Sequence, residues 1–177
     1  IVLRRKGITM PIVVLNADAG SFDKMVANDL QPEIYSFHSL RDFRACVERY
    51  GAHNYPIHIK LDTGMHRLGF VEPELDALIE QLMADKVVKV ASVFAHLSCA
   101  DDESKDDFTR EQISVFDRMS RRLVEALPYK VLRHTANSAA IERFPEAQFD
   151  MCRLGLGLYG YGYKHNDELQ PVSTLKT

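Results

Sequence analysis

The sequence contains no tryptophan and few cysteines. The three cysteines, Cys46, Cys99 and Cys152, lie far apart and form no C-x-x-C pair, which argues against a disulfide framework and against a structural zinc site. The seven histidines are scattered, with no H-E-x-x-H or comparable spacing of metal ligands. We therefore expect no metal site, and a reducing, cytoplasmic environment.

Long apolar runs and charge of one dominant sign are also missing. No stretch of about 18 apolar residues occurs, so no transmembrane helix is expected. The chain carries 22 Lys and Arg against 25 Asp and Glu, a net charge of −3. This balance argues against nucleic-acid binding and against electrostatic membrane docking. No signal peptide is expected, because no apolar stretch follows the basic residues 4–6.

The 177 residues are too few for a complete parallel (β/α)8 barrel, which needs roughly 250 residues. Short apolar runs nevertheless alternate with helical patterns, which predicts an α/β fold whose parallel sheet has right-handed crossovers. The predicted strands are 11–16, 34–37, 56–62, 87–97, 130–134 and 151–160. The predicted helices are 21–30, 39–50 with Ser39 as N-cap, one from about Pro73, 106–127 and 138–143. An open doubly wound sheet and part of a (β/α)8 barrel both fit this alternation.

A lysine lies within the strand predicted over 56–62. Strand alternation puts His58, Lys60 and Asp62 on one face and the apolar residues on the other. A buried lysine is costly unless its charge is removed or paired. The structural explanation is a salt bridge to a carboxylate of a neighbouring strand.

Other polar residues follow the predicted strands, at the end of a parallel sheet where ligands bind. Asn137 and Ser138 lie at a strand-to-helix junction, where they fit either a phosphate site or ordinary N-capping. Arg153 interrupts an apolar segment and needs an acceptor, either a ligand heteroatom or a carboxylate. His96 ends an apolar strand and fits a core histidine as well as a catalytic one. The Gly155-x-Gly pattern alone is weak evidence.

Taken together, four stretches resemble alanine racemase, a pyridoxal-5′-phosphate (PLP) enzyme of the fold type III barrel class. The stretches are 60–69, 94–101, 134–140 and 153–160. Their order and spacing agree with the family, and the resemblance runs essentially from residue 1 to residue 177. It implies interconversion of L-alanine and D-alanine, which supplies D-alanine for cell-wall peptidoglycan. The implied substrate is a small amino acid, and the implied parent is a cytoplasmic homodimer.

The resemblance implies roles for the residues around the cofactor ring and phosphate. Arg153 would donate to the pyridine nitrogen, which then stays unprotonated because a guanidinium keeps its proton. The ring becomes a weaker electron sink, which limits side reactions such as transamination. Ser138 would hold the phosphate together with the backbone N–H groups of Gly155 and Leu156.

Further roles are implied for residues around the ring. His134 and Asn137 would support the site, with His134 orienting Arg153, and His96 would lie beside the ring. Arg67 would contact the phenolic oxygen of the cofactor and the substrate carboxylate. Lys60 falls where several family members carry a carbamylated lysine paired with that arginine, so carbamylation of Lys60 is a hypothesis. The residue before Arg67 is often glycine in the family and is His66 here.

The family's two acid/base groups, the Schiff-base lysine and a tyrosine, have no counterpart in this sequence. We therefore expect an internal fragment that is inactive alone: residues 1–163 as strands three to eight of an incomplete barrel, and 164–177 as a linker with the first residues of a C-terminal β domain. An open sheet edge would be covered by a partner copy or by further chain. The alternatives are a non-catalytic PLP-binding barrel protein, a decarboxylase of this fold type, whose Gly-Gly-Gly phosphate loop is absent here, and a fragment with a structural role.

Overall fold

A parallel sheet of five strands forms the centre of the computed structural model, which describes residues 1–163 and 169–172. The strands lie side by side in sequence order: β1 (Val13–Val14), β2 (Gln31–Ile34), β3 (Tyr55–Lys60), β4 (Val88–Phe94) and β5 (Leu132–His134). Every neighbouring pair is parallel, so the predicted α/β class is confirmed. Because a doubly wound sheet reverses its strand order at a switch point, that architecture is not observed in the described part of the chain.

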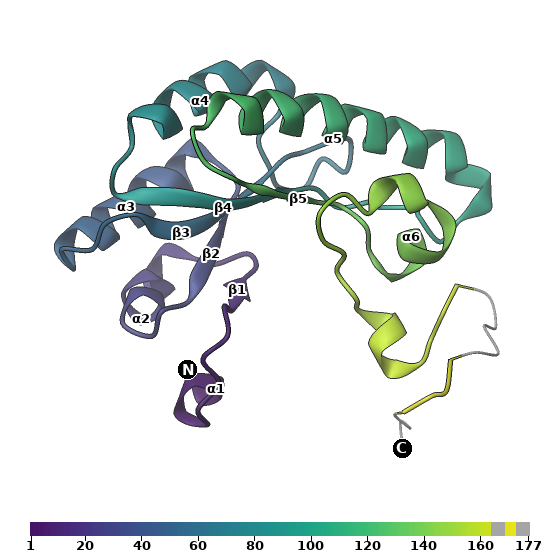
Figure 1. Ribbon diagram of the computed structural model, residues 1–177, viewed down its shortest axis with the longest axis horizontal. Helices are drawn as coiled ribbons and strands as arrows, with labels where there is room; N and C mark the ends of the chain where they lie inside the picture. Colours follow the sequence, from purple (N-terminus) through teal and green to yellow (C-terminus); the bar gives the residue numbers. More distant parts are fainter. Residues whose placement is uncertain (164–168, 173–177) are drawn as a thin grey trace.

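Helices precede, separate and follow the strands along the chain. They are α1 (Val2–Arg5), α2 (Phe22–Val26), α3 (Phe37–Arg49), α4 (Leu75–Ala84), α5 (Asp106–Ala126) and α6 (Ser138–Arg143), with 3₁₀ turns η1 (Ala19–Ser21), η2 (Glu72–Glu74), η3 (Glu103–Lys105), η4 (Pro145–Ala147) and η5 (Leu156–Tyr159). Figure 1 shows α4 and α5 packed together along the upper face of the sheet. None of the described helices is long and apolar enough to cross a membrane.

The two faces of the sheet differ in chemistry, as the alternation in β3 predicts. Ile57 and Ile59 are fully buried in the apolar core between the sheet and the helices, together with Phe116 of α5. His58 and Lys60 alternate with them and are also buried, but their partners are polar side chains of the neighbouring strands. The face opposite the helices is therefore an interior polar surface.

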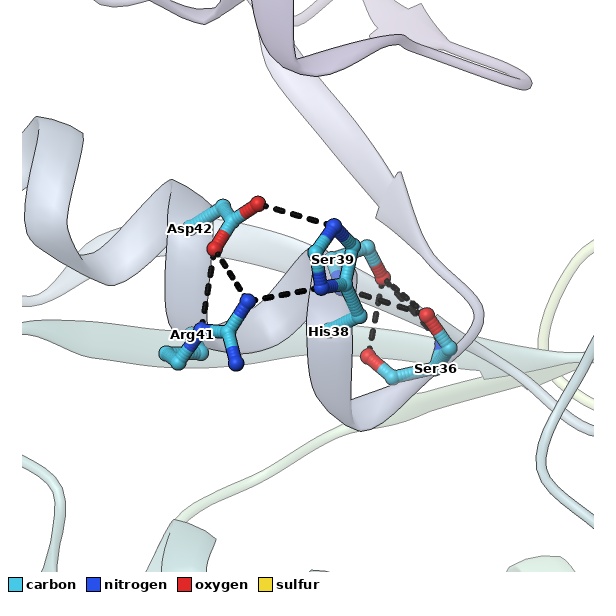
Figure 2. A network of polar contacts seen from close by, with 5 residues as sticks. All are labelled: Ser36, His38, Ser39, Arg41 and Asp42. Carbon is cyan, nitrogen blue, oxygen red and sulfur yellow. Dashed lines mark hydrogen bonds and ion pairs between the residues drawn. The ribbon is translucent and has the colours of Figure 1, made fainter.

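The N-cap of α3 lies three residues earlier than predicted. Its N-cap is Ser36, whose Oγ accepts a hydrogen bond from the Ser39 N–H at 3.1 Å, while Ser39 Oγ accepts from the Ser36 N–H at 3.1 Å. Figure 2 shows this reciprocal capping box and the exposed network beside it, in which Asp42 contacts His38 and Arg41. Ser39 as N-cap was therefore wrong, because a second serine one turn earlier makes the better cap.

The strand predicted over 151–160 was wrong. Residues 151–155 form no ladder, and η5 follows at Leu156–Tyr159. Gly155 adopts φ −106° and ψ −100°, which is not an extended conformation, and its N–H donates to a side-chain hydroxyl instead of a neighbouring strand. The predicted six-strand pattern therefore becomes five strands in the described chain. The boundary predicted after residue 163 mostly concerns residues 164–168 and 173–177, which lie outside the described residues.

Candidate active site

A cavity of about 660 Å³ opens at the carboxyl ends of β4 and β5. This volume lies in the usual range for small-molecule sites. The segments that line it follow β4, begin α6 and form the turn after Arg153. Six of the predicted site residues are brought together here: His96, Asn137, Ser138, Arg153, Gly155 and Leu156.

Arg153 is held in one orientation by backbone and side-chain acceptors. Its Nη2 donates to the carbonyl oxygens of Ala95 at 2.7 Å and Thr135 at 3.2 Å, and its Nη1 lies 2.8 Å from His134 Nδ1. Burial lowers the pKa of Arg153 to about 10, so the guanidinium is still charged at neutral pH. Within the described residues its Nε makes no hydrogen bond. Arg153 lines the cavity, so this nitrogen is its available donor to a ligand.

His134 is a buried, neutral partner of Arg153. Burial first, and then the positive charge of Arg153, lower the pKa of His134 to about 3. A guanidinium can only donate, so His134 Nδ1 accepts from Arg153 and the ring proton sits on Nε2. The ring also stacks on Phe94 with a centroid separation of 5.0 Å and an interplanar angle of 2°.

Ser138 gathers backbone donors from the glycine-rich turn. Its Oγ accepts the N–H of Gly155 at 2.9 Å and the N–H of Gly157 at 3.1 Å. The Gly157 N–H, which sequence reasoning missed, also donates to this hydroxyl, while the contact of the Leu156 N–H with the phosphate stays a prediction. A Cβ at Gly157 would lie 3.5 Å from Ser138 Oγ and 2.8 Å from Leu154 Cδ1, so a larger residue here would require the Leu154 side chain to move. Oriented N–H groups of this kind form anion-binding concavities.

Asn137 performs the ordinary capping role. Its Oδ1 accepts the N–H of Ala140 at 3.0 Å and so caps α6, while its Nδ2 donates to the carbonyl oxygen of Leu97 at 3.0 Å. The capping alternative is confirmed for Asn137. Because Asn137 provides the cap, the Ser138 hydroxyl is left for the glycine turn.

His96 and Arg67 contribute differently to the site. His96 lines the cavity, and its pKa is lowered by burial and then by the positive charges of Arg153, Arg67 and Lys60. Arg67 is exposed and lies outside the cavity lining. Its charge is near enough to act on His96, but its contacts with cofactor and substrate stay predictions.

The loop before Arg67 is shaped by Asp62. The Asp62 Oδ1 accepts the N–H groups of Gly64 at 2.9 Å and His66 at 3.0 Å, and these bonds act against burial to hold the pKa of Asp62 below its usual value. His66 has a φ of +55°, in the left-handed region that favours glycine. This explains why glycine suits the residue before Arg67 in the family pattern.

Lys60 forms an ion pair with a residue that sequence reasoning missed. Its Nζ lies 2.9 Å from Glu33 Oε1, and both side chains are buried at 8% and 1% exposure. The other Glu33 oxygen accepts the N–H of Asn16. The predicted salt bridge to a neighbouring strand is confirmed, with Glu33 on β2. A carbamate on Lys60 would place a second anion beside Glu33. Carbamylation of Lys60 stays a hypothesis.

Parallel strands with a half-buried arginine and the backbone donors of a glycine-rich turn at their carboxyl ends define the class, an α/β protein with a cavity at the end of the sheet where such folds bind ligands. Residues 1–162 match the family model described as alanine racemase, N-terminal domain, and the chain belongs to this family. No group of three or more potential metal ligands occurs among the described residues.

Individual relatives agree with this assignment. The chain is 35% identical to the alanine racemase of Methanococcus maripaludis over 182 residues, 98% of this chain and 48% of that protein. Among solved structures, the alanine racemase of Clostridium difficile 630 is 30% identical with a TM-score of 0.81, covering 95% of this chain and 43% of that one. The alanine racemase of Bartonella henselae, described with covalently bound pyridoxal phosphate, shares the fold at 24% identity and a TM-score of 0.78, covering 96% of this chain and 49% of that one. The chain spans less than half the length of these relatives.

Proposed function

We propose that this chain is the PLP-binding part of an alanine racemase, which interconverts L-alanine and D-alanine. The observation that carries the proposal is the pairing of a fixed Arg153 with the Ser138 turn on one cavity. The five strands would belong to a (β/α)8 barrel that the chain spans only in part. Family membership also supports a cytoplasmic homodimer that supplies D-alanine for peptidoglycan.

The residues present fit PLP. Ser138 and the N–H groups of Gly155 and Leu156 would hold the phosphate. The hydrogen bonds from Gly155 and Gly157 to Ser138 Oγ support this, because they keep the glycine-rich turn beside that hydroxyl. Arg153 Nε would donate to the pyridine nitrogen. When bound, PLP supplies the electron sink that makes removal of the Cα proton possible.

The protein's own contribution is to fix the protonation around that ring. Arg153 stays charged at neutral pH and keeps its proton, so a ring nitrogen that accepts from it would stay unprotonated. His134 stays neutral and accepts from Arg153, which keeps the guanidinium aimed into the cavity. His96 would lie beside the ring, and Arg67 would meet the phenolic oxygen and the substrate carboxylate.

Binding of PLP to the Ser138 turn can be measured by fluorescence titration. We expect Ser138→Ala to weaken PLP binding about tenfold, because the phosphate loses a hydroxyl donor. Pyridoxal, which lacks the phosphate, should bind the variant and the original protein equally. Ser114→Ala, an exposed serine of α5, is the matched control and should leave both affinities unchanged. Equal PLP affinity in Ser138→Ala would contradict the phosphate site.

Racemisation is tested on the complete product of the gene that encodes this chain. L-alanine is supplied with PLP, and the appearance of D-alanine is followed by chiral chromatography against a free-PLP blank. We expect turnover above the blank. PLP binding without turnover would instead support the non-catalytic PLP-binding barrel protein.

A further inference from the structure

A row of polar side chains crosses four strands on the face of the sheet opposite the helices. Gln31 Oε1 lies 2.8 Å from His58 Nε2, and His58 Nδ1 lies 2.6 Å from Ser92 Oγ. Ser92 Oγ lies 2.9 Å from His134 Nε2, and His134 Nδ1 lies 2.8 Å from Arg153 Nη1. Since His58 and Ser92 are register partners in the β3–β4 ladder, the sheet itself sets the spacing of the row.

The direction of every hydrogen bond in the row follows from its two ends. Arg153 can only donate, so His134 Nδ1 accepts and His134 Nε2 carries the proton. That proton is donated to Ser92, whose own hydroxyl proton then goes to His58 Nδ1. His58 Nε2 donates in turn to the Gln31 amide oxygen, which only accepts. When both histidines are neutral, every hydrogen bond in the row has one donor and one acceptor.

Burial favours this neutral arrangement. His58, Ser92 and His134 are 7%, 1% and 5% exposed. Burial lowers the pKa of His58 to about 4, and that of His134 is lowered to about 3. Neither imidazole therefore gains a second ring proton near neutral pH, and the tautomer becomes the only freedom left to each ring.

The tautomer of His134 matters because of Arg153. A proton on His134 Nδ1 would face the Arg153 N–H donor directly, and the two groups would repel each other. An acceptor at Nε2 prevents this by holding the proton at the far side of the ring. In the row that acceptor is Ser92, and it accepts because its hydroxyl proton is committed to His58.

We propose that Gln31, His58 and Ser92 are positioning residues that hold His134 as the Nε2–H tautomer and thereby keep the Arg153 guanidinium aimed at the ligand ring nitrogen. None of the three is among the residues that line the cavity. The assignment of the His134 tautomer rests only on the hydrogen bonds of the row. The ligand part rests on the proposed PLP function.

The first test reads the tautomer directly. Two-bond ¹⁵N–¹H correlation spectra of ¹⁵N-histidine-labelled protein distinguish Nε2–H from Nδ1–H rings. We expect His134 in the Nε2–H form in the original protein, and in Ser92→Thr, which keeps a hydroxyl. In Ser92→Ala we expect a substantial Nδ1–H population. Ser114→Ala serves as the control. An unchanged His134 tautomer in Ser92→Ala would overturn the proposal.

The second test reads the consequence for the ligand. The probes are PLP and its 1-deaza analogue, in which a C–H replaces the ring nitrogen. We expect the original protein to prefer PLP about tenfold and Ser92→Ala to lose most of this preference, with rescue in Ser92→Thr. A general structural loss would weaken both probes equally and would overturn the ligand part.

Two outcomes separate this inference from the proposed function. If neither probe binds the original protein, the proposed function fails, while the tautomer spectra still decide on the row. If Ser92→Ala does not fold, Gln31→Leu at the half-buried end of the row provides the second variant. It removes the terminal acceptor, and we expect a smaller shift of the His58 and His134 tautomers in the same direction. If neither tautomer shifts in Gln31→Leu, the proposed coupling along the row of hydrogen bonds is contradicted.

Discussion

The two buried histidines should make the folded protein sensitive to mild acid. Burial lowers the pKa of His58 to about 4, and burial with the Arg153 charge lowers that of His134 to about 3, against 6.5 for a free side chain. Below pH 6.5 the unfolded chain therefore binds protons that the folded chain does not. Their contribution to stability is complete above pH 6.5 and is lost as the pH falls toward 4 and then 3.

The size of the effect follows from these values. Between pH 7 and pH 5 each histidine should remove about 2 kcal/mol of unfolding free energy. His58→Asn abolishes one of the two titrations, while the Asn Oδ1 can still accept from Ser92. The loss of stability between the two pH values should therefore be about 2 kcal/mol smaller in His58→Asn than in the original protein. Carboxylates contribute equally to both proteins and cancel in this difference.

Urea unfolding followed by circular dichroism at both pH values measures the difference. His53→Asn is the matched control, because His53 is exposed and its substitution should leave the pH dependence unchanged. His58→Asn will itself lower stability at pH 7 through a lost hydrogen bond to Gln31, but only the change with pH enters the comparison. An equal pH dependence in His58→Asn and the original protein would refute the assignment of His58 as a buried neutral ring.

Three further sets of substitutions test separate features by chemical denaturation. Lys60→Met leaves Glu33 buried and unpaired and should cost about 3–5 kcal/mol, most of which the double variant with Glu33→Leu should recover. Asn137→Ala removes the cap of α6 together with the bond to Leu97 and should cost about 1–2 kcal/mol. His66→Gly should be about 1 kcal/mol more stable than His66→Ala, because both lose the side chain but only alanine keeps the strain of a positive φ.

Each of these outcomes has a clear opposite. A mild effect of Lys60→Met, or a double variant no better than the single one, would show that the ion pair is not buried and coupled. Asn137→Ala within error of the original protein would remove the capping role. Equal stability of the two His66 variants would mean that the loop relaxes away from the left-handed conformation.

Helices and strands whose sequence signals lie within the element itself could be predicted from the sequence. Helix α6 has the predicted bounds, and α5 ends one residue before its predicted end, because apolar spacing and capping residues are contained in the helices themselves. The strand predicted over 151–160 was wrong because the conformation of this segment depends on a residue distant in the sequence. Ser138 takes the N–H groups of Gly155 and Gly157 that a strand would have given to a ladder.

The candidate site shows the same division. Arg153 and Ser138 could be found from motifs and from the family resemblance. Glu33 and Ser92 could not, because their importance comes from partners on neighbouring strands. Glu33 pairs in register with His58 and shares the polar face with Lys60, but it precedes the strand predicted over 34–37, so the alternation of that segment does not include it.

Arg153 also replaces a strand in holding its segment to the sheet. Its backbone N–H donates to Ala136, and its guanidinium reaches acceptors in the residues after both β4 and β5. The Arg153 side chain thereby holds the glycine-rich turn that follows it to the ends of two strands by hydrogen bonds. Ligand recognition and local stability are consequently linked through a single guanidinium: a ligand that engages Arg153 should slow local opening of the turn, and a substitution that loosens the turn should weaken the ligand even without touching it.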